Sequence, residues 1–457
     1  MKVAVIGCTH AGTAAITNIL NQYPFAEIDV FEKNDNVSFL SCGIALYVGG
    51  VVEDENGLFY ASVEQFEKNG VRMHMNNEVT MCDVTTKQLI ARDMNTDKLT
   101  TYKYDKLIIT SGSWPVTPPI PGKELENVQL CKNFTHAKEI IKRAENAQNV
   151  VVVGAGYIGV ELVEAFEENG KNVTLIDSEE RILNRYLDAT FTTPVQETFE
   201  KRGIQLALNQ TVSKFEGRDK VEKVITDRGE YEADLVVMCI GFRPNTKLLE
   251  GQVDMLPNGA IIVDKYMQTN VEDVYAAGDC CAVNYNPTYA PAYIPLATNA
   301  VRMGTLVAHN LITPTLPHPG TQGTSGLKIY NHNIASTGLT ETAAKQAGLT
   351  VASAYIEDNY RPEFMPDNAL IQLKLVYETE THRIVGAQVI SDADFTQAIN
   401  TLSVSIANNM TIEQLALTDF FFQPHYNKPW NYLNQVALQA LQNETSKARD
   451  RGLLLNK

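Results

Sequence analysis

Cys42 is the residue of this sequence with the clearest capacity for chemistry. It lies in the segment SFLSCGIALYVGG, where Ser38 or Ser41 is expected to cap a following helix and to place the thiol near its first turn. The positive end of a helix favours the thiolate, the reactive form of cysteine, and lowers its pKa. The pattern predicts a redox-active thiol. A small buried side chain that only fills space is the alternative.

A glycine-rich loop in the middle of the chain predicts a dinucleotide site. Gly154, Gly156 and Gly159 form a complete GxGxxG between the apolar run NVVVV and a helical pattern. Such glycines make the tight turn, let the backbone approach a pyrophosphate and let the helix pack closely. Asp177 follows at roughly the 20-residue spacing expected of a ribose-binding acid, which favours NADH over NADPH. A purely structural glycine turn is the alternative.

The N-terminal segment VAVIGCTHAG repeats this plan with one departure. Gly7 and Gly12 occupy the outer glycine positions, but Thr9 stands in the middle one, and Glu32 supplies the acid. Two dinucleotide units in one chain predict two different cofactors. A later glycine-aspartate turn ends at Asp279, whose carboxylate is expected either to hold a flavin ribityl chain at a helix N-terminus or to act as an ordinary N-cap.

Bulk composition restricts the classes of function. The formal net charge of -16 disfavours nucleic acid and anionic membranes as partners. No apolar stretch reaches the roughly 18 residues of a membrane span, and the N-terminal apolar run passes directly into a glycine loop, so the cytoplasm is the expected compartment. The seven cysteines are scattered without a CxxC, which weighs against zinc, and no metal site is predicted. Cys280 and Cys281 are expected to begin a helix.

The elements that must position these residues form an α/β chain of several domains. A length of 457 residues predicts two to four domains. Two Rossmann-like units, joined by Ser/Gly/Pro-rich crossovers, precede alternating strands and helices that predict a C-terminal α+β domain. The expected limits are as follows: 1–117 for the first part of one dinucleotide domain, 118–246 for the other, 247–325 for the return to the first, and 326–457 for the C-terminal domain.

Motifs spread over nearly the whole chain resemble one family. VIGCTHAG, FEKNDNVSFLSCGIALYVGG, VVGAGYIGVE, CIGFRPNT, VYAAGD and FFFQPHYNKPWNYLN are together similar to the single-cysteine branch of the pyridine nucleotide-disulfide oxidoreductase family. The resemblance implies a glutathione-reductase-like fold with an FAD domain, an NADH domain and a C-terminal dimerisation domain. Two-cysteine relatives carry a second cysteine at the register of Tyr47, so no redox disulfide of that type is expected here.

The resemblance also implies roles for individual residues. Cys42 would cycle between thiolate and sulfenic acid beside the flavin, and His10 would bond to the sulfur or to a peroxide oxygen. The alternative for His10 is a helix-start histidine that faces the pyrophosphate. The expected FAD-binding residues are Gly7, His10, Ala11, Gly12, Glu32, Lys33, Cys42, Thr110, Ser111, Gly112, Ser113, Lys132, Asp279, Leu296, Ala297, Thr298 and Phe422. The expected NADH-binding residues are Gly154, Gly156, Tyr157, Ile158, Gly159, Glu161, Asp177, Tyr186 and Gly241.

The implied activity is that of an FAD-dependent NADH oxidase that reduces O2 to water. Tyr157 would be an aromatic gate over the flavin, Glu161 would lie near the nicotinamide, and Phe422 would reach a flavin. NADH peroxidase and coenzyme A-disulfide reductase are the alternatives within the family, and a flavin-based redox sensor is the alternative from another class. A homodimer with shared sites is implied, and a higher oligomer is left open.

Overall fold

The N-terminal apolar run becomes the central strand of a parallel sheet whose strands come from distant parts of the chain. The computed structural model describes residues 1–450, and the order in this first sheet is β19-β7-β1-β2-β3. Strands of such sheets are covered on both faces, which explains their continuous apolar runs. The strands are β1 (Lys2–Ile6), β2 (Glu27–Glu32), β3 (Arg72–Met75), β7 (Lys106–Ile109) and β19 (Val274–Ala276).

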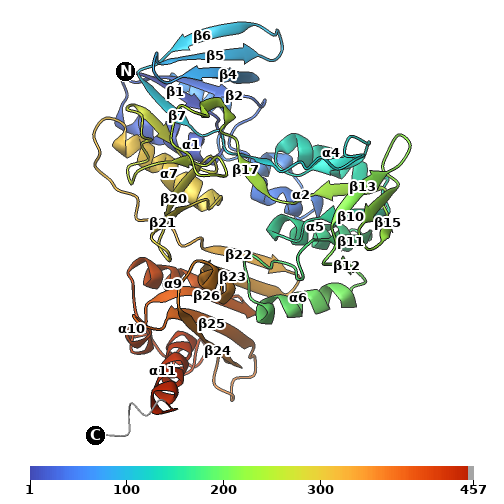
Figure 1. The fold of residues 1–457 in the computed structure, drawn as a ribbon, viewed down its shortest axis with the longest axis vertical. Helices are drawn as coiled ribbons and strands as arrows, with labels where there is room; N and C mark the ends of the chain where they lie inside the picture. The colour runs from blue at the N-terminus through green and yellow to red at the C-terminus, as the bar shows by residue number, and fades with distance from the viewer. Residues whose placement is uncertain (451–457) are drawn as a thin grey trace.

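Two helices far apart in the sequence pack against each other beside this first sheet. They are α1 (His10–Gln22) and α7 (Ala297–Asn310). A small antiparallel sheet extends the lobe at the top of Figure 1. The remaining elements of the lobe are α3 (Val63–Lys68), β4 (Asn77–Asp83), β5 (Gln88–Asp93), β6 (Leu99–Lys103), β18 (Ile261–Ile262), β20 (Cys281–Tyr285) and β21 (Ala290–Ala292).

The second lobe repeats the doubly wound plan around the run NVVVV. Its parallel sheet has the order β12-β11-β10-β16-β9 and lies on the right in Figure 1. The strands are β9 (Val128–Leu130), β10 (Asn149–Val153), β11 (Asn172–Ile176), β12 (Gln205–Ala207) and β16 (Leu235–Met238). Three helices and a meander complete it: α4 (Phe134–Ala144), α5 (Tyr157–Glu168), α6 (Ala189–Lys201), β13 (Val212–Glu216), β14 (Lys223–Thr226) and β15 (Glu230–Glu232).

Both chain crossings between these lobes meet in one two-stranded antiparallel ribbon. Strand β8 (Ser113–Pro115) leaves the first lobe and β17 (Phe242–Pro244) returns to it. The second lobe is therefore inserted within the first, since β19 completes the first sheet only after the return. The domain limits at residues 117, 246 and 325 stay a prediction.

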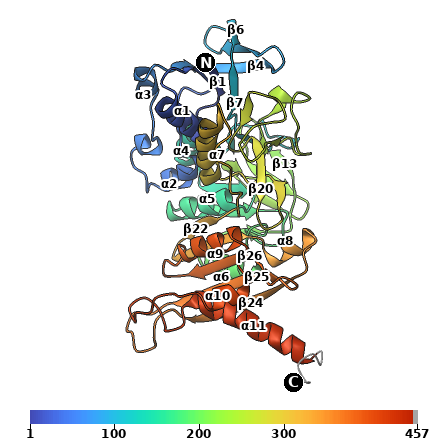
Figure 2. The same ribbon diagram turned by 90° about the vertical axis from the view of Figure 1, so that its left-hand side faces the viewer.

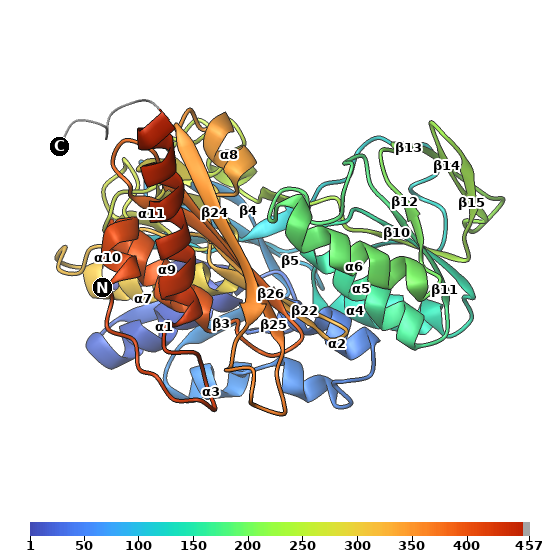
Figure 3. The same ribbon diagram turned by 90° about the horizontal axis from the view of Figure 1, so that it is seen from below.

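The third lobe lies at the end of the molecule far from the N-terminus (Figure 2). Its antiparallel sheet has the order β22-β23-β26-β25-β24, and α9 and α11 cross one face of it (Figure 3). Every residue of the central strand β26 is buried, so both faces of the sheet are covered there. The elements are β22 (Ser325–Ile329), β23 (His332–Gly338), α8 (Glu341–Gln346), β24 (Val351–Asn359), β25 (Leu370–Glu378), β26 (Ile384–Ser391), α9 (Ala398–Ala407), α10 (Ile412–Ala416) and α11 (Tyr432–Asp450).

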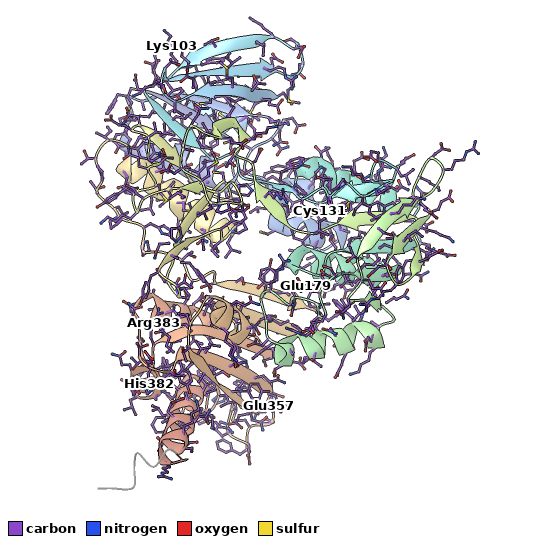
Figure 4. The ribbon with its side chains drawn as sticks, viewed as in Figure 1. Lys103, Cys131, Glu179, Glu357, His382 and Arg383 are labelled. Atoms are coloured by element: carbon purple, nitrogen blue, oxygen red, sulfur yellow. The ribbon has the colours of Figure 1, made fainter. Side chains whose placement is uncertain are left out.

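A buried arginine ties the third lobe to the first. Arg383, labelled in Figure 4, donates to the backbone carbonyls of Asn286 (3.3 Å) and Pro287 (2.9 Å). Its charge is balanced within its own lobe by Glu378 at 2.9 Å. Burial of an unpaired arginine would lower the stability of the fold, and the ion pair with Glu378 offsets that cost.

One sequence-based assignment of secondary structure is wrong in the first lobe. Cys281 begins the strand β20 rather than a helix, and the Cys280 thiol donates to the backbone carbonyl of Ile109 at 3.3 Å. Pairing of β20 with β18 and β21 holds this backbone extended, and the local sequence did not reveal those partners. No helix within residues 1–450 combines the length and the apolar character needed to cross a membrane.

Candidate active site

Cys42 lies in a single helical turn rather than at the start of a long helix. The turn Ser41–Gly43 runs directly into α2 (Ile44–Val48), and no side chain caps either of them. The prediction that Ser38 or Ser41 caps a helix is therefore wrong. Ser38 instead uses its hydroxyl to hold a neighbouring loop, described below.

The predicted lowering of the Cys42 pKa is also wrong for this chain. The side chain reaches the surface, yet the protein around the thiol desolvates it enough to raise its pKa. The negative charge of Glu161 raises this pKa further, while Lys132 acts in the opposite direction. A helix as short as α2 has only a weak dipole. Desolvation and the Glu161 carboxylate therefore outweigh the dipole, and the pKa of Cys42 rises.

Glu161 comes close to Cys42 because α2 packs along α5. Asn169, near the end of α5, donates its side-chain amide to the carbonyl of Val48 at 3.1 Å. Glu161 lies about two turns earlier on α5, level with the start of α2. Burial, reinforced by the neighbouring Glu164, raises the pKa of Glu161 to about 7.

His10 begins α1 and presents one free ring nitrogen to the site. Its Nδ1 lies 2.9 Å from the hydroxyl of Tyr60, and the two rings stack with centroids 5.8 Å apart. Burial lowers the pKa of His10, so the imidazole is neutral at pH 7. Its Nε2 is buried and finds no protein partner within residues 1–450. Buried polar atoms are nearly always satisfied, so this nitrogen indicates a ligand.

A charged cluster lies beside both His10 and Cys42. Lys132 donates to the hydroxyl of Ser113 at 3.0 Å and pairs with Asp279 at 3.4 Å, and Ser113 donates to the same carboxylate at 2.9 Å. The charges of Lys132 and Asp279 act on the pKa of His10 and on that of Cys42, so both side chains lie within electrostatic reach of this cluster. Asp279 does not begin a helix, because the strand β20 follows it; the helix N-terminus predicted at this turn is absent.

The first glycine loop is closely packed around backbone. Gly7 has φ +95°, and a Cβ on it would lie 2.4 Å from the carbonyl oxygen of Thr110. At the end of β2, Glu32 is 4% exposed and accepts from the backbone N–H groups of Cys8 (2.7 Å) and Asn34 (2.9 Å). Burial raises the pKa of Glu32 despite these bonds.

The second glycine loop uses the same device at a more open site. Gly154 has φ +109°, and a Cβ on it would lie 2.4 Å from the carbonyl oxygen of Cys239. Asp177 accepts from the backbone N–H groups of Ala155 and of Glu179, the latter at 2.8 Å. The loop opens on a cavity of about 350 Å³ whose lining includes Gly154, Gly156, Asp177, Glu179, Arg181, Tyr186, Gln210, Thr211 and Gly241.

Two aromatic rings stand where this cavity meets the third lobe. The centroids of Tyr157 and Tyr186 lie 4.3 Å apart, and the hydroxyl of Tyr157 bonds to that of Ser325 at 2.8 Å. Burial raises the pKa of both phenols. Tyr157 begins α5, one helical turn before Glu161, so both side chains belong to the same end of that helix.

Most of the other predicted FAD residues lie around the first loop. Thr110 is buried and donates to the carbonyl of Gly7 at 2.7 Å, and Ser111 donates to the carbonyl of Asn245 at 2.7 Å. Lys33 instead pairs with Glu78 at 2.7 Å on the surface. The remaining positions are Ala11 and Gly12 in α1, Gly112 before β8, Leu296 as the cap of α7, and Ala297 and Thr298 in its first turn.

Phe422 is not brought to this cluster within one chain. It lies between α10 and α11 and is 48% exposed, in the same segment as exposed Leu417, Phe421, Tyr426 and Trp430. On the NADH side, Ile158 and Gly159 lie in the first turn of α5, and Gly241 has φ +98° between β16 and β17.

Sequence reasoning missed two tyrosines. Tyr60 bonds to His10 from 50 residues away, and no local pattern announces that contact. The buried hydroxyl of Tyr293 has no partner among the described residues, and burial raises its pKa in the electrostatic reach of Asp279. Glu179, by contrast, had a signal, because it follows the predicted ribose acid by two positions.

These groups fit a flavin dinucleotide in the first lobe and a nicotinamide dinucleotide in the second. Glycines without Cβ atoms let the backbone of both loops approach a pyrophosphate. The acids at the end of β2 and directly after β11, buried Glu32 and partly buried Asp177, retain acceptor sites for ribose hydroxyls. The unpartnered nitrogen of His10 and hydroxyl of Tyr293 suit a polar ring system between Cys42 and Asp279.

Comparisons with known proteins agree with this architecture. Residues 1–304 match the model of the pyridine nucleotide-disulphide oxidoreductases, and residues 324–432 match the dimerisation domain of that family. The chain is 54% identical to an NADH oxidase of Enterococcus faecalis over 97% of this chain and 100% of that protein. It is 43% identical to an NADH oxidase of Streptococcus pyogenes over 96% of this chain and 99% of that one.

A solved structure extends the likeness to three dimensions. The water-forming NADH oxidase of Lactobacillus brevis, bound to NADH, superposes with a TM-score of 0.97 at 50% identity, covering 98% of this chain and 100% of that one. The three lobes described above are thus arranged as in a solved structure. The chain belongs to the pyridine nucleotide-disulphide oxidoreductase family.

Proposed function

We propose that this protein is an FAD-dependent NADH oxidase that reduces O2 by four electrons, so that two NADH and two protons yield two molecules of water. The proposal rests on the exposed thiol of Cys42 and on His10 Nε2, which has no partner within residues 1–450, both within electrostatic reach of Lys132 and Asp279. Tyr47 stands where a two-cysteine relative would place its second thiol, and its hydroxyl bonds to Glu55 at 3.2 Å.

The residues of each lobe have distinct tasks. FAD, when bound, accepts hydride from NADH and passes electrons to O2. The first loop, with Gly7, Glu32 and Asp279, holds it, and the second loop binds NADH. Asp177 accepts from a ribose hydroxyl and repels a 2′-phosphate, which gives the preference for NADH. Tyr157 and Tyr186 close the cavity until the nicotinamide enters.

Cys42 decides whether oxygen leaves as water or as peroxide. Its thiolate attacks one oxygen of hydrogen peroxide, the O–O bond breaks, and the departing oxygen takes up a proton and leaves as water. The sulfur is oxidised by two electrons to sulfenic acid. A second NADH supplies the two electrons that return the sulfenic acid to thiolate, with release of the second water.

His10 and Glu161 shape the surroundings of the sulfur. The neutral imidazole offers Nε2 to the sulfur or to the oxygen bound on it, without adding a competing positive charge. Glu161, near the nicotinamide end of the cavity, raises the pKa of Cys42 and so limits the thiolate when no other charge is present.

Oxygen consumption with limiting NADH tests the proposal. Two NADH consumed per O2, with no oxygen returned by catalase, is the expected result. One NADH per O2 with return of oxygen by catalase would mean a peroxide-forming reaction. Absence of oxygen uptake would overturn the proposal in favour of NADH peroxidase or a disulfide reductase, which the loss of NADH absorbance on addition of peroxide distinguishes.

We further propose a homodimer formed through the third lobe. The exposed apolar side chains between α10 and α11, including Phe422, suit an interface, and Phe422 would then reach the flavin of a second copy. Light scattering of the purified protein separates a dimer from a higher oligomer. Free thiols at all seven cysteines suit the reducing cytoplasm.

A further inference from the structure

Tyr60 is the one protein group that holds the His10 ring by a hydrogen bond within the described residues. Its hydroxyl lies 2.9 Å from Nδ1, and the two rings are within 4° of parallel. The opposite nitrogen, Nε2, is buried and has no partner among residues 1–450. The geometry therefore fixes which nitrogen the protein holds and which is left for a ligand.

The position of Tyr60 is itself set by an unusual serine. Ser38 has φ +59°, a left-handed conformation that is rare for residues other than glycine, asparagine and aspartate. From there its hydroxyl oxygen accepts from the backbone N–H groups of Tyr60 (3.1 Å) and Ala61 (2.9 Å) and donates to the carbonyl of Ala61 at 2.9 Å. Uncommon backbone of this kind persists where its surroundings require it, often at functional sites.

A neutral phenol and a neutral imidazole can form this bond in two directions. Burial raises the pKa of Tyr60 to about 12, so the phenol keeps its proton, and burial lowers the pKa of His10, so the imidazole carries only one. If that proton were on Nδ1, it would be donated to the phenol oxygen, and Nε2 would offer only a lone pair to a ligand. With the proton on Nε2, Tyr60 donates to Nδ1 and the free nitrogen is an N–H donor.

We propose that Tyr60 is a positioning residue that holds His10 as the Nε2–H tautomer, so that His10 donates a hydrogen bond to the departing oxygen of a peroxide that Cys42 attacks. The inference rests on the proposed oxidase function and deepens it. In the step it serves, the Cys42 thiolate bonds to one peroxide oxygen, the O–O bond breaks, and the other oxygen gains a proton from solvent and leaves as water. Cys42 is oxidised by two electrons and the peroxide is reduced by two; His10 keeps its proton.

The test is the rate at which the holoenzyme forms sulfenic acid on Cys42. Hydrogen peroxide is added without NADH, and the sulfenic acid is trapped with dimedone and mapped to the Cys42 peptide by mass spectrometry. Tyr60→Phe removes only the hydroxyl and is expected to slow trapping about five- to tenfold, the worth of one hydrogen bond. Tyr47→Phe, which removes a hydroxyl bonded to Glu55, is the matched control and should stay within about twofold of the unmodified protein.

A double-mutant cycle separates positioning from general damage. Because Tyr60 acts through His10, Tyr60→Phe should have no further effect in a His10→Gln background. In NADH turnover, Tyr60→Phe should release more peroxide while the KM for NADH is unchanged. Equal rates for Tyr60→Phe and the unmodified protein, or fully additive effects in the cycle, would overturn the inference.

A direct reading of the tautomer keeps the inference testable should the variants fold poorly. Nitrogen-15 NMR of the histidine-labelled holoenzyme, assigned with His10→Gln, is expected to show the proton on Nε2, and a proton on Nδ1 would refute it. The proposed oxidase function fails separately, since unmodified protein that consumes no oxygen would refute that function while leaving the tautomer result intact.

Discussion

The two dinucleotide loops of this protein share a plan but differ in enclosure. In both, an acid at the end of the second strand accepts the backbone N–H that follows the first glycine: Glu32 from Cys8, and Asp177 from Ala155. Glu32 is 4% exposed, whereas Asp177 is only partly buried and lines an open cavity. The enclosed first loop suits a cofactor that stays bound, and the open second loop suits a substrate that must leave after each turnover.

Replacing the first glycine of each loop by alanine is expected to have the largest effect, and a different effect in each lobe. Gly7→Ala would place a Cβ 2.4 Å from a backbone oxygen, with positive φ, and is expected to give protein that lacks flavin. Gly154→Ala meets an equally close backbone oxygen but should keep its flavin and lose NADH reduction. Flavin absorbance of the purified variants and anaerobic titration with NADH measure both outcomes; flavin loss from both would contradict the division of tasks.

Removing the thiol should leave both loops intact and change only the product. Cys42→Ser is expected to oxidise NADH still, but to release one hydrogen peroxide for each NADH, because no sulfur remains to accept the second oxygen. The oxygen electrode with catalase detects this as oxygen return. Retained four-electron reduction in the variant would remove Cys42 from the mechanism.

Asp177, the ribose-binding acid of the open loop, is expected to control the choice between NADH and NADPH. Asp177→Asn keeps the shape but removes the charge, and the KM for NADH should rise about tenfold or more because a charged hydrogen bond is lost. Discrimination against NADPH should fall in the same variant. Exposed Glu200→Gln on α6, which is not among the residues that line the cavity, serves as the control.

The smallest expected effect is that of the Glu161 carboxylate on the reactivity of Cys42. Glu161 raises the pKa of Cys42, so Glu161→Gln should speed alkylation of Cys42 about three- to tenfold at pH 8. Below pH 7 the difference should vanish, because the pKa of Glu161 is raised to about 7 and the group becomes neutral there. Peptide mapping after iodoacetamide treatment follows Cys42 alone. Exposed Glu168→Gln is the matched control on the same helix, and an equal effect there would point to bulk charge.

Local patterns predicted much of this molecule from its sequence. The second glycine motif and Asp177 form the strand–loop–helix site that their spacing predicts. The crossovers rich in Ser, Gly and Pro correspond to the paired strands β8 and β17. What failed depended on distant neighbours. The pKa of Cys42 is raised by desolvation and then by Glu161, which lies far away in the sequence. The backbone after Asp279 is extended by sheet pairing, and Tyr60 reaches His10 across 50 residues.

The insertion of the second lobe within the first has a consequence for synthesis. Strand β19 borders β7 and completes the first sheet, but its residues lie after the whole NADH-binding lobe in the chain. While the ribosome extends the chain, one edge of β7 therefore stays unpaired until residues 274–276 have emerged. By then the inserted lobe already has all of its own strands. Long-range pairing of this kind is slow and exposes aggregation-prone edges, so the nicotinamide lobe is expected to fold first and the flavin lobe to depend on it for timing.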